Sequence, residues 1–132
     1  RVVGAFTVQA NNILQICDVI DYFLNDMGIV FYSHRVNYPM TLSAQTLPPE
    51  LKTKVVNDLE YMKIKILDFA VIQENELLKK VTLQQIQDNI NFLQAKCMYE
   101  SHWQDCIEFN KRLDKTRKQD FLLANPEFKL YV

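Results

Sequence analysis

Glycine is scarce in this chain of 132 residues and occurs only at Gly4 and Gly28. An average composition, with about 7% glycine, would give roughly nine. Phosphate-binding loops of the G-x-x-x-x-G-K and G-x-G-x-x-G types need glycine for positive φ and close backbone approach, so this sequence can contain neither. The scarcity also argues against many tight hairpins and favours helices joined by polar turns.

The few cysteines, the balanced charge and the lack of long apolar runs narrow the class of protein further. Cys17, Cys97 and Cys106 are an odd number without a disulfide-scaffold spacing, which predicts a reducing, cytoplasmic location. Fifteen Lys and Arg against sixteen Asp and Glu give a net charge of -1 with no block of one sign, which argues against a nucleic-acid-binding surface. No apolar run reaches the ~18 residues of a membrane span, and no signal-peptide pattern opens the chain.

The remaining composition is that of a globular domain, with 48% hydrophobic and 23% charged residues. The sequence opens at Arg1, inside what looks like a strand, and its first methionine is Met27. We therefore expect a piece of a longer protein.

The first part of the chain has the pattern of a βαβ unit. Residues 2–9 are rich in β-branched and aromatic types and predict a strand that is covered on both faces. Asn11 and Asn12 offer an N-cap for a helix over residues 13–26, and Gly28 stands where a left-handed cap would end it. Residues 29–36 predict a second, parallel strand, and residues 37–46 an extended connection.

Helical patterns follow. Pro48 and Pro49 mark a helix start, and the core face of that helix is Leu51, Val55, Leu59 and Met62, with Val56 and Ile66 at its margin. The apolar pattern breaks over residues 64–80. The capping-box spacing at residues 82–85 predicts a helix whose core face holds Ile86, Ile90, Leu93 and Cys97, and the same spacing at 101–104 predicts a last long helix that Asn125-Pro126 stops.

The expected fold is therefore α-rich α/β. One βαβ unit of a partial barrel or parallel sheet spans residues 1–46, and a helical region of three or four helices, residues 47–132, packs on it as one unit.

The chemistry-bearing residues are few. Cys97, His102 and Cys106 come nearest to a metal site but lack a fourth ligand, so a structural role is favoured and a metal site stays a third, weaker hypothesis. His34 has no serine, cysteine or acid placed to make it a base. Asp18 and Asp21 are typical of solvated charge on a helix.

Two polar groups are more informative. Gln9, Asn11 and Asn12 follow the first strand, at the end where parallel sheets and barrels place their ligands, and they are the candidate substrate- or cofactor-facing residues; a plain helix cap is the competing interpretation of Asn12. Asp114 and Arg117 stand three apart on the last helix, where they form an exposed ion pair or Arg117 reaches inward and docks the helix.

Several segments, in order, resemble one enzyme family. Thr7-Val-Gln-Ala-Asn-Asn-Ile-Leu-Gln15 with Val19-Ile-Asp-Tyr-Phe23 is similar to the late βα unit of radical S-adenosylmethionine (radical SAM) enzymes, in the phage and marine-bacterial type with a twitch domain. The helix start Leu47-Pro-Pro-Glu-Leu-Lys52 is similar as well. So is the end, where Leu113-Asp-Lys-Thr-Arg117 leads to Phe121 and Pro126-Glu127.

The departure from that family is equally informative. Radical SAM enzymes hold a [4Fe-4S] cluster with a Cys-x-x-x-Cys-x-x-Cys motif and bind S-adenosylmethionine at a glycine-rich strand end, and this sequence has neither. The resemblance therefore implies the C-terminal part of such an enzyme, with no cofactor of its own and no activity alone; the cluster and S-adenosylmethionine belong to a full-length parent.

The sequence supports two hypotheses for the function. The first is a catalytically incomplete portion of a radical SAM-like enzyme, which covers the barrel and helps to position substrate, with the missing N-terminal half or another subunit as its partner. The alternative is a non-enzymatic, helical protein-interaction module. Exposed strand edges in an isolated two-strand unit predict self-association into a homo-oligomer.

Overall fold

The computed structural model describes residues 2–132 and contains a parallel two-stranded sheet followed by helices. Strands β1 (Val3–Val8) and β2 (Val30–Arg35) pair in a register that runs from Val3 opposite Val30 to Val8 opposite Arg35. The link between them is continuously helical, with a 3-10 turn η1 (Ile13–Gln15), helix α1 (Ile16–Asp21) and a π-helical turn η2 (Tyr22–Asp26). Gly28 has φ +63° just after it. The predicted βαβ unit and α-rich α/β class are confirmed.

One face of the sheet packs against this helical link. Phe23 lies against Phe31, with ring centroids 6.2 Å apart, and Phe31 in turn contacts Phe6 at 6.5 Å. A Cβ atom at Gly4 would lie 2.4 Å from a Phe23 ring carbon, so glycine is what allows the ring to sit on the strand. The scarce glycines thus have separate local tasks, one in packing and one in ending a helix.

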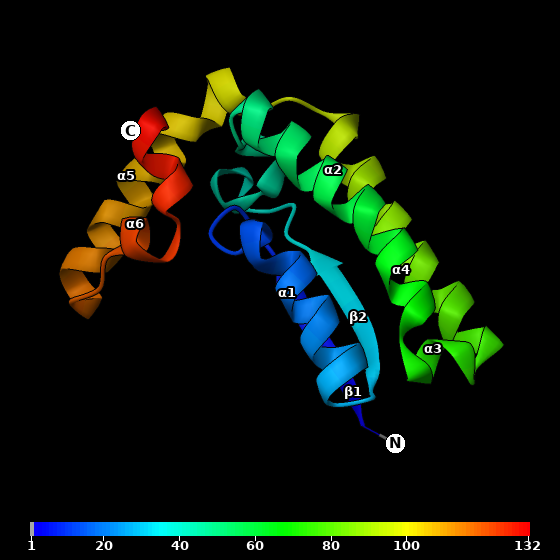
Figure 1. Ribbon diagram of the computed structural model, residues 1–132. Helices are drawn as coiled ribbons and strands as arrows, with labels where there is room; N and C mark the ends of the chain where they lie inside the picture. Colours follow the sequence, from blue (N-terminus) through cyan, green and yellow to red (C-terminus); the bar gives the residue numbers. More distant parts are fainter. Residues whose placement is uncertain (1) are drawn as a thin grey trace.

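The helices form the rest of the molecule. They are α2 (Pro49–Lys65), α3 (Ala70–Gln73), α4 (Glu76–Ala95), α5 (Tyr99–Arg117) and α6 (Phe121–Ala124), with 3-10 turns η5 (Ile66–Asp68) and η6 (Pro126–Tyr131). Figure 1 shows two arms that meet at an angle. The sheet arm holds residues 3–95, and the C-terminal arm holds residues 99–131. None of these helices is long and apolar enough to cross a bilayer.

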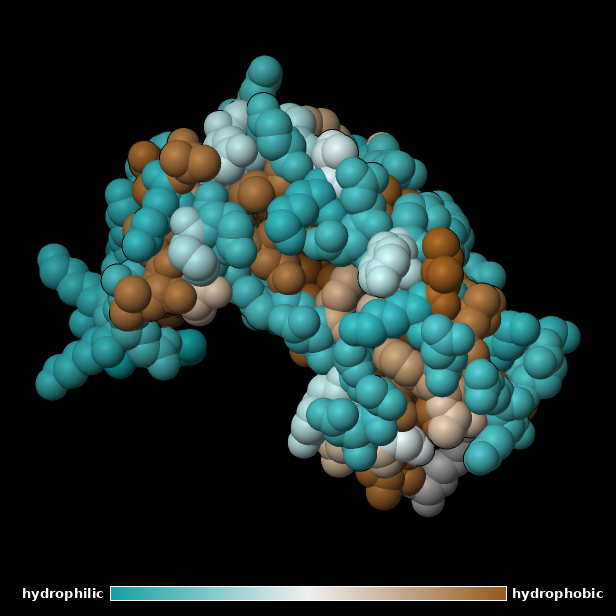
Figure 2. All heavy atoms as spheres, viewed as in Figure 1, coloured by the Kyte–Doolittle hydropathy of each residue, from teal (hydrophilic) through white to brown (hydrophobic). Residues whose placement is uncertain are grey.

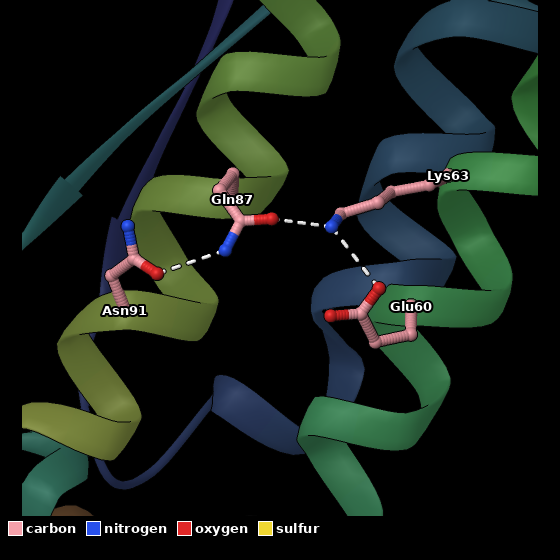
Figure 3. Close-up of polar contacts among 4 residues, drawn as sticks. All are labelled: Glu60, Lys63, Gln87 and Asn91. Carbon is pink, nitrogen blue, oxygen red and sulfur yellow. Dashed lines mark hydrogen bonds and ion pairs between the residues drawn. The ribbon is translucent and has the colours of Figure 1, made fainter.

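Helices α2 and α4 lie side by side along the sheet arm. The face of α2 predicted from the sequence is buried at Leu51, Val55, Leu59 and Met62. Near the surface, the Lys63 ammonium donates to Gln87 Oε1 on α4 and pairs with Glu60 at 3.0 Å, while Gln87 Nε2 donates to Asn91 Oδ1 at 2.8 Å (Figure 3). Such exposed contacts add little free energy, so the apolar seam stabilises the pair.

Helix α4 also seals the outer edge of β2. Gln85 Oε1 accepts hydrogen bonds from Ser33 N at 3.0 Å and from Ser33 Oγ at 2.8 Å, and Asn89 Nδ2 donates to Ser33 Oγ at 2.9 Å. Ser33 and Asn89 are both buried. The side chains of one helix therefore take the place that a neighbouring strand would have at this edge.

The opposite side of the sheet is open. Within the described residues β1 pairs with no strand other than β2. On the face turned away from α1, Val3 is 45% exposed and Tyr32 37% exposed, and Ala5, Thr7 and His34 are exposed too. Figure 2 shows apolar side chains at the surface near the foot of the sheet arm. The strand expected to be covered on both faces is covered on one.

The connection predicted to be extended over residues 37–46 contains two 3-10 turns, so that prediction is wrong. They are η3 (Met40–Leu42) and η4 (Ala44–Thr46). Leu42 O accepts from Ala10 N at 2.8 Å, and Ser43 Oγ accepts from Gln45 N at 3.2 Å. Serine and threonine hydroxyls offer the backbone such local partners, which favour turns over extended chain.

Both capping-box predictions are wrong as well. Helix α4 begins six residues before Thr82, where Asn75 Oδ1 accepts from Leu78 N at 3.0 Å, and Thr82 itself is fully buried in mid-helix. Helix α5 begins at Tyr99, so Ser101 already lies inside it. Cys97, predicted on the core face of the earlier helix, lies beyond the end of α4 and is exposed.

The prediction that the last long helix runs to Asn125-Pro126 is also wrong. Helix α5 ends at Arg117, and Lys118 adopts a left-handed conformation with φ 54°. Asp114 Oδ2 then accepts from Phe121 N at 2.9 Å and fixes the start of the short helix α6. Asn125-Pro126 separates α6 from η6 instead of stopping α5.

Candidate functional site

The sequence-predicted residues lie in the turn that follows β1. Asn12 Nδ2 donates to Thr7 O at 2.8 Å, and Asn12 Oδ1 accepts from Gln9 N at 3.0 Å. Asn12 stands at the N-cap position of η1, but its side chain makes no capping bond to that turn. Its amide braces the end of the strand, so the helix-cap interpretation of Asn12 is wrong.

Asn11 faces the C-terminal arm and forms a reciprocal amide pair. Its Nδ2 donates to Asn110 Oδ1 at 2.5 Å, and Asn110 Nδ2 donates back to Asn11 Oδ1 at 2.9 Å. Asn125 Nδ2 donates to Asn11 O at 2.9 Å, and Gln15 Nε2 donates to Asn125 Oδ1 at 3.2 Å. We call these four residues, Asn11, Gln15, Asn110 and Asn125, the amide cluster.

The amide cluster is built from four separate elements. Asn110 lies on the buried stripe of α5 and Asn125 directly before Pro126, and both are almost fully buried, at 2% and 1% exposure. A buried amide without partners would cost about 1–3 kcal/mol, so the mutual bonds are needed to bury these side chains at all. The cluster joins the end of β1 to α5 and α6.

A small cavity of about 170 Å³ opens beside the amide cluster. Asn11, Asn110 and Asn125 line it, together with Asp114 and Arg117. Behind it, burial raises the pKa of the Cys106 thiol to about 11, although hydrogen bonds from Thr46 and Asn110 act in the opposite direction. Amides and a neutral thiol transfer no protons near neutral pH. The amide cluster can hold a polar group by hydrogen bonds. The carboxylate that lines the cavity beside it, Asp114, accepts a hydrogen bond from Phe121 N at 2.9 Å.

Arg117 does not dock the helix. Its side chain is exposed, and neither it nor Asp114 takes part in an ion pair within residues 2–132. The inward reach inferred for Arg117 is therefore wrong, because the helix ends at this residue and its side chain turns to solvent. Asp21, in contrast, pairs with Lys65 at 2.8 Å, and that hydrogen bond lowers the pKa of the Asp21 carboxyl.

The structure separates the three residues of the weak metal hypothesis. Cys97 is exposed, Cys106 is buried, and His102 Nδ1 contacts Ser101 Oγ at 2.7 Å. Over residues 2–132, no three His, Cys, Asp or Glu side chains gather in a way that could hold a metal ion. Cys17, Cys97 and Cys106 likewise form no such group within the described residues.

Gln9, Asn11 and Asn12 were placed correctly at the end of β1, but sequence reasoning missed their partners. Asn110 did carry a signal, since it interrupts the apolar stripe of the last long helix. A polar residue at a core position predicts a buried hydrogen-bond partner. Nothing in the sequence identifies that partner as Asn11, which lies 99 positions away.

Comparison with known proteins adds no relative. No protein-family model, curated protein or solved structure matches this chain.

Proposed function

We propose that this chain is the C-terminal, catalytically incomplete portion of a radical SAM-like enzyme. In this proposal the βαβ unit extends a partial barrel, and the helices cover that barrel and help to position its substrate. The observation that carries the proposal is the open edge of β1 together with the uncovered sheet face beside it.

A parallel sheet with one bare face and one free edge is unusual, since such sheets are normally covered on both faces. Exposed edges in natural proteins are protected by charges, proline or bulges, but residues 2–8 contain none of these. The β2 edge, by contrast, is sealed by Gln85. This sheet can therefore be extended only on the β1 side, as a further barrel strand would extend it.

The amide cluster supports the substrate-positioning part of the proposal. It lies at the carboxyl end of β1, which is the end where parallel barrels and sheets bind their ligands. Its donors and acceptors suit a neutral polar group of a substrate. The cluster-binding and S-adenosylmethionine-binding residues of the family belong to the other half of the parent enzyme, and no step of the radical chemistry is assigned to this chain.

A second candidate is the protein-interaction module. It is favoured by the exposed leucines of the C-terminal arm, Leu123 at 75% and Leu130 at 87% exposure. Those side chains lie outside the amide cluster and are available to a helical partner. This candidate predicts a stable monomer that needs no further strand.

Light scattering during size-exclusion chromatography separates the two candidates. The open edge predicts self-association that rises with protein concentration and is suppressed by Ala5→Lys, which adds a charge to the bare face. Gln104→Lys, an exposed change on α5, is the matched control and should leave association unchanged. A chain that stays monomeric at its highest soluble concentration would contradict sheet extension and favour the module.

The family assignment has its own test in the reading frame that precedes Arg1. The proposal expects a Cys-x-x-x-Cys-x-x-Cys motif encoded there, followed by a glycine-rich strand end. A complete reading frame without that motif overturns the radical SAM assignment, even if the sheet-extension result stands.

A further inference from the structure

The largest of the cavities described here, of about 390 Å³, lies away from the amide cluster, between the start of α2 and the end of α4. Its volume falls in the range of small-molecule sites, about 300–1,000 Å³. Part of its wall is apolar, from Pro49, Val56 and Leu93, and Asn57 and Gln94 add amide groups. The remaining lining residues include Lys52, Lys96 and Cys97.

The charge of this cavity is one-sided. Two lysines line it, no aspartate or glutamate does, and neither lysine has a carboxylate within 4.0 Å among the described residues. Lysines elsewhere do form ion pairs; the exposed Lys54, for example, pairs with Asp58 at 2.8 Å. A cavity with two cations and no acid is suited to an anion.

Lys52 is the unusual member of the pair. The residue is only 8% exposed, and its ammonium donates to Lys96 O, the backbone carbonyl just beyond α4, at 2.6 Å. An ammonium has three N–H donors, so two of them have no described protein acceptor. Burial lowers the pKa of Lys52. Burying a cation without a counter-charge is costly, and an anion bound in the cavity would offset that cost.

We propose that this cavity binds a small organic carboxylate, whose negative group pairs with Lys52 and Lys96 while its apolar body lies against Val56 and Leu93. The site is independent of the proposed function. It rests on the coincidence of a cavity of small-molecule size, an acid-free lining with two lysines, and a buried lysine with spare N–H donors.

Cys97 supplies a built-in reporter for this site. It lines the cavity and is exposed, whereas Cys17 is half-buried and Cys106 buried. Iodoacetate and iodoacetamide alkylate a thiolate by the same displacement: sulfur attacks the methylene carbon, iodide leaves, and the thiol proton passes to the buffer. The two reagents differ in that only iodoacetate carries a carboxylate.

The experiment measures the alkylation rate of Cys97 by mass spectrometry and takes the ratio of iodoacetate to iodoacetamide. A peptide covering residues 95–101 retains Lys96 and gives the reference ratio. We expect the ratio in the folded protein to be about tenfold higher than in the peptide, since one nearby cation in a partly desolvated site has an effect of that order. Equal ratios in protein and peptide would overturn the proposal.

Variants assign the effect to Lys52. Lys52→Met should return the ratio to that of the peptide, and Lys52→Arg should retain most of the increase. Lys54→Met, on the same helix but exposed, is the control and should leave the ratio unchanged. An unaltered ratio in Lys52→Met would contradict the proposed pairing.

A second measurement avoids any instability of the Lys52 variants. Hexanoate should protect Cys97 of the unaltered protein from the uncharged reagent N-ethylmaleimide in a saturable manner, whereas hexanamide should not. Val56→Phe, which fills the apolar part of the cavity, should abolish this protection. Equal protection by inorganic phosphate, or none by hexanoate, would show that the cavity does not select organic carboxylates.

Discussion

The lack of a side chain at Gly4 allows the βαβ unit to pack closely. A Cβ atom at Gly4 would approach three Phe23 ring carbons to 2.4–2.6 Å, well inside contact distance. Phe23 is in turn held against Phe31. The first strand can therefore lie close to its crossover helix only because position 4 lacks a side chain.

Gly4→Ala should destabilise the protein by about 1–3 kcal/mol, because overpacking forces either the ring or the strand to shift. Urea denaturation measures the change. Shrinking the ring should relieve the clash, so Gly4→Ala with Phe23→Leu should cost less than the sum of the two single changes. Gly28→Ala is the contrast: its Cβ meets nothing within 4 Å but needs φ +63°, a strain of about 1–2 kcal/mol that Phe23→Leu leaves in place. Strict additivity at positions 4 and 23 would contradict the packing argument.

The half-buried Cys17 and the buried Cys106 predict a loss of stability in alkaline solution. Burial raises the pKa of Cys17 to about 12 and that of Cys106 to about 11, against an ordinary value of 9.0. The unfolded chain releases these protons first as the pH rises above 9, so the folded state is favoured below pH 9 and loses stability towards pH 11–12. The slope is at most about 1.4 kcal/mol per pH unit for each thiol.

Denaturant titrations between pH 8 and 11 test this linkage. Cys17→Ala and Cys106→Ala should each flatten the decline, whereas Cys97→Ala, at an exposed position, should not. A decline equally steep in all three variants would show that other groups cause it.

At the scale of elements, the start of α4 allows the observed N-cap residue to be compared with the one predicted from the sequence. Asn75 caps the helix in the structure, whereas the sequence pattern favoured Thr82, whose buried Oγ1 has no described hydrogen-bond partner. Asn75→Ala should therefore cost about 1 kcal/mol. Thr82→Val keeps the shape and removes an unsatisfied hydroxyl, so it should be neutral or stabilising. Thermal unfolding of the two variants checks both signs, and a larger loss from Thr82→Val would contradict the observed cap.

Elements with strong periodicity could be predicted from the sequence, whereas helix ends could not. The spacings of apolar residues over 2–36 and along α2 could be read from the sequence, because periodicity shows which face of an element is buried without identifying what covers it. The end of α5 depends on the bond from Phe121 N to Asp114 and on a left-handed lysine, and neither has a local signature. The capping-box spacing misled because Thr82 is buried in mid-helix and Gln85 bonds to Ser33 of β2.

At the candidate site, too, the position of residues could be predicted from the sequence but their long-range partners could not. Polar residues at the end of β1 were expected there, because strand topology alone fixes that position. Their pairing with Asn110 and Asn125 depends on how the two arms meet, and no local pattern specifies it. The cavity at Lys52 was missed for a similar reason, since it joins the start of α2 to a segment 44 residues later.

At the scale of the whole molecule, the amide cluster ties the C-terminal arm to the sheet arm. Aromatic packing holds the C-terminal arm together internally, with Trp103 edge-on to Phe128 at 5.1 Å and Trp103 Nε1 donating to Tyr131 O at 2.9 Å. The contacts from Asn110 and Asn125 to Asn11 then cross from one arm to the other. Together with the packing of α5 against η3 and η4, they hold the two arms at the angle visible in Figure 1.

Asn110→Ala should cost about 1–3 kcal/mol, because it leaves the amide of Asn11 without its partner. Hydrogen exchange should show the loss of protection mainly in α5 and α6, with α2 and α4 less affected. Asn91→Ala removes an amide whose side-chain bond is to Gln87 on an exposed surface, and it should change neither measurement appreciably. Uniform loss of protection across both arms would show that the cluster does not join them selectively.

The sealed edge of β2 limits how far any β-mediated assembly can grow. Each molecule has one edge that accepts a strand and one that Gln85 and α4 block. Head-to-tail addition needs two accepting edges, so we expect the covered β2 edge to disfavour fibre growth through native sheets. Two copies that meet through β1 would instead form an isologous pair, and that pair would terminate growth. The contact from Gln85 to Ser33, together with the packing of α4 on β2, thus sets an expected upper limit of two on edge-to-edge polymerisation.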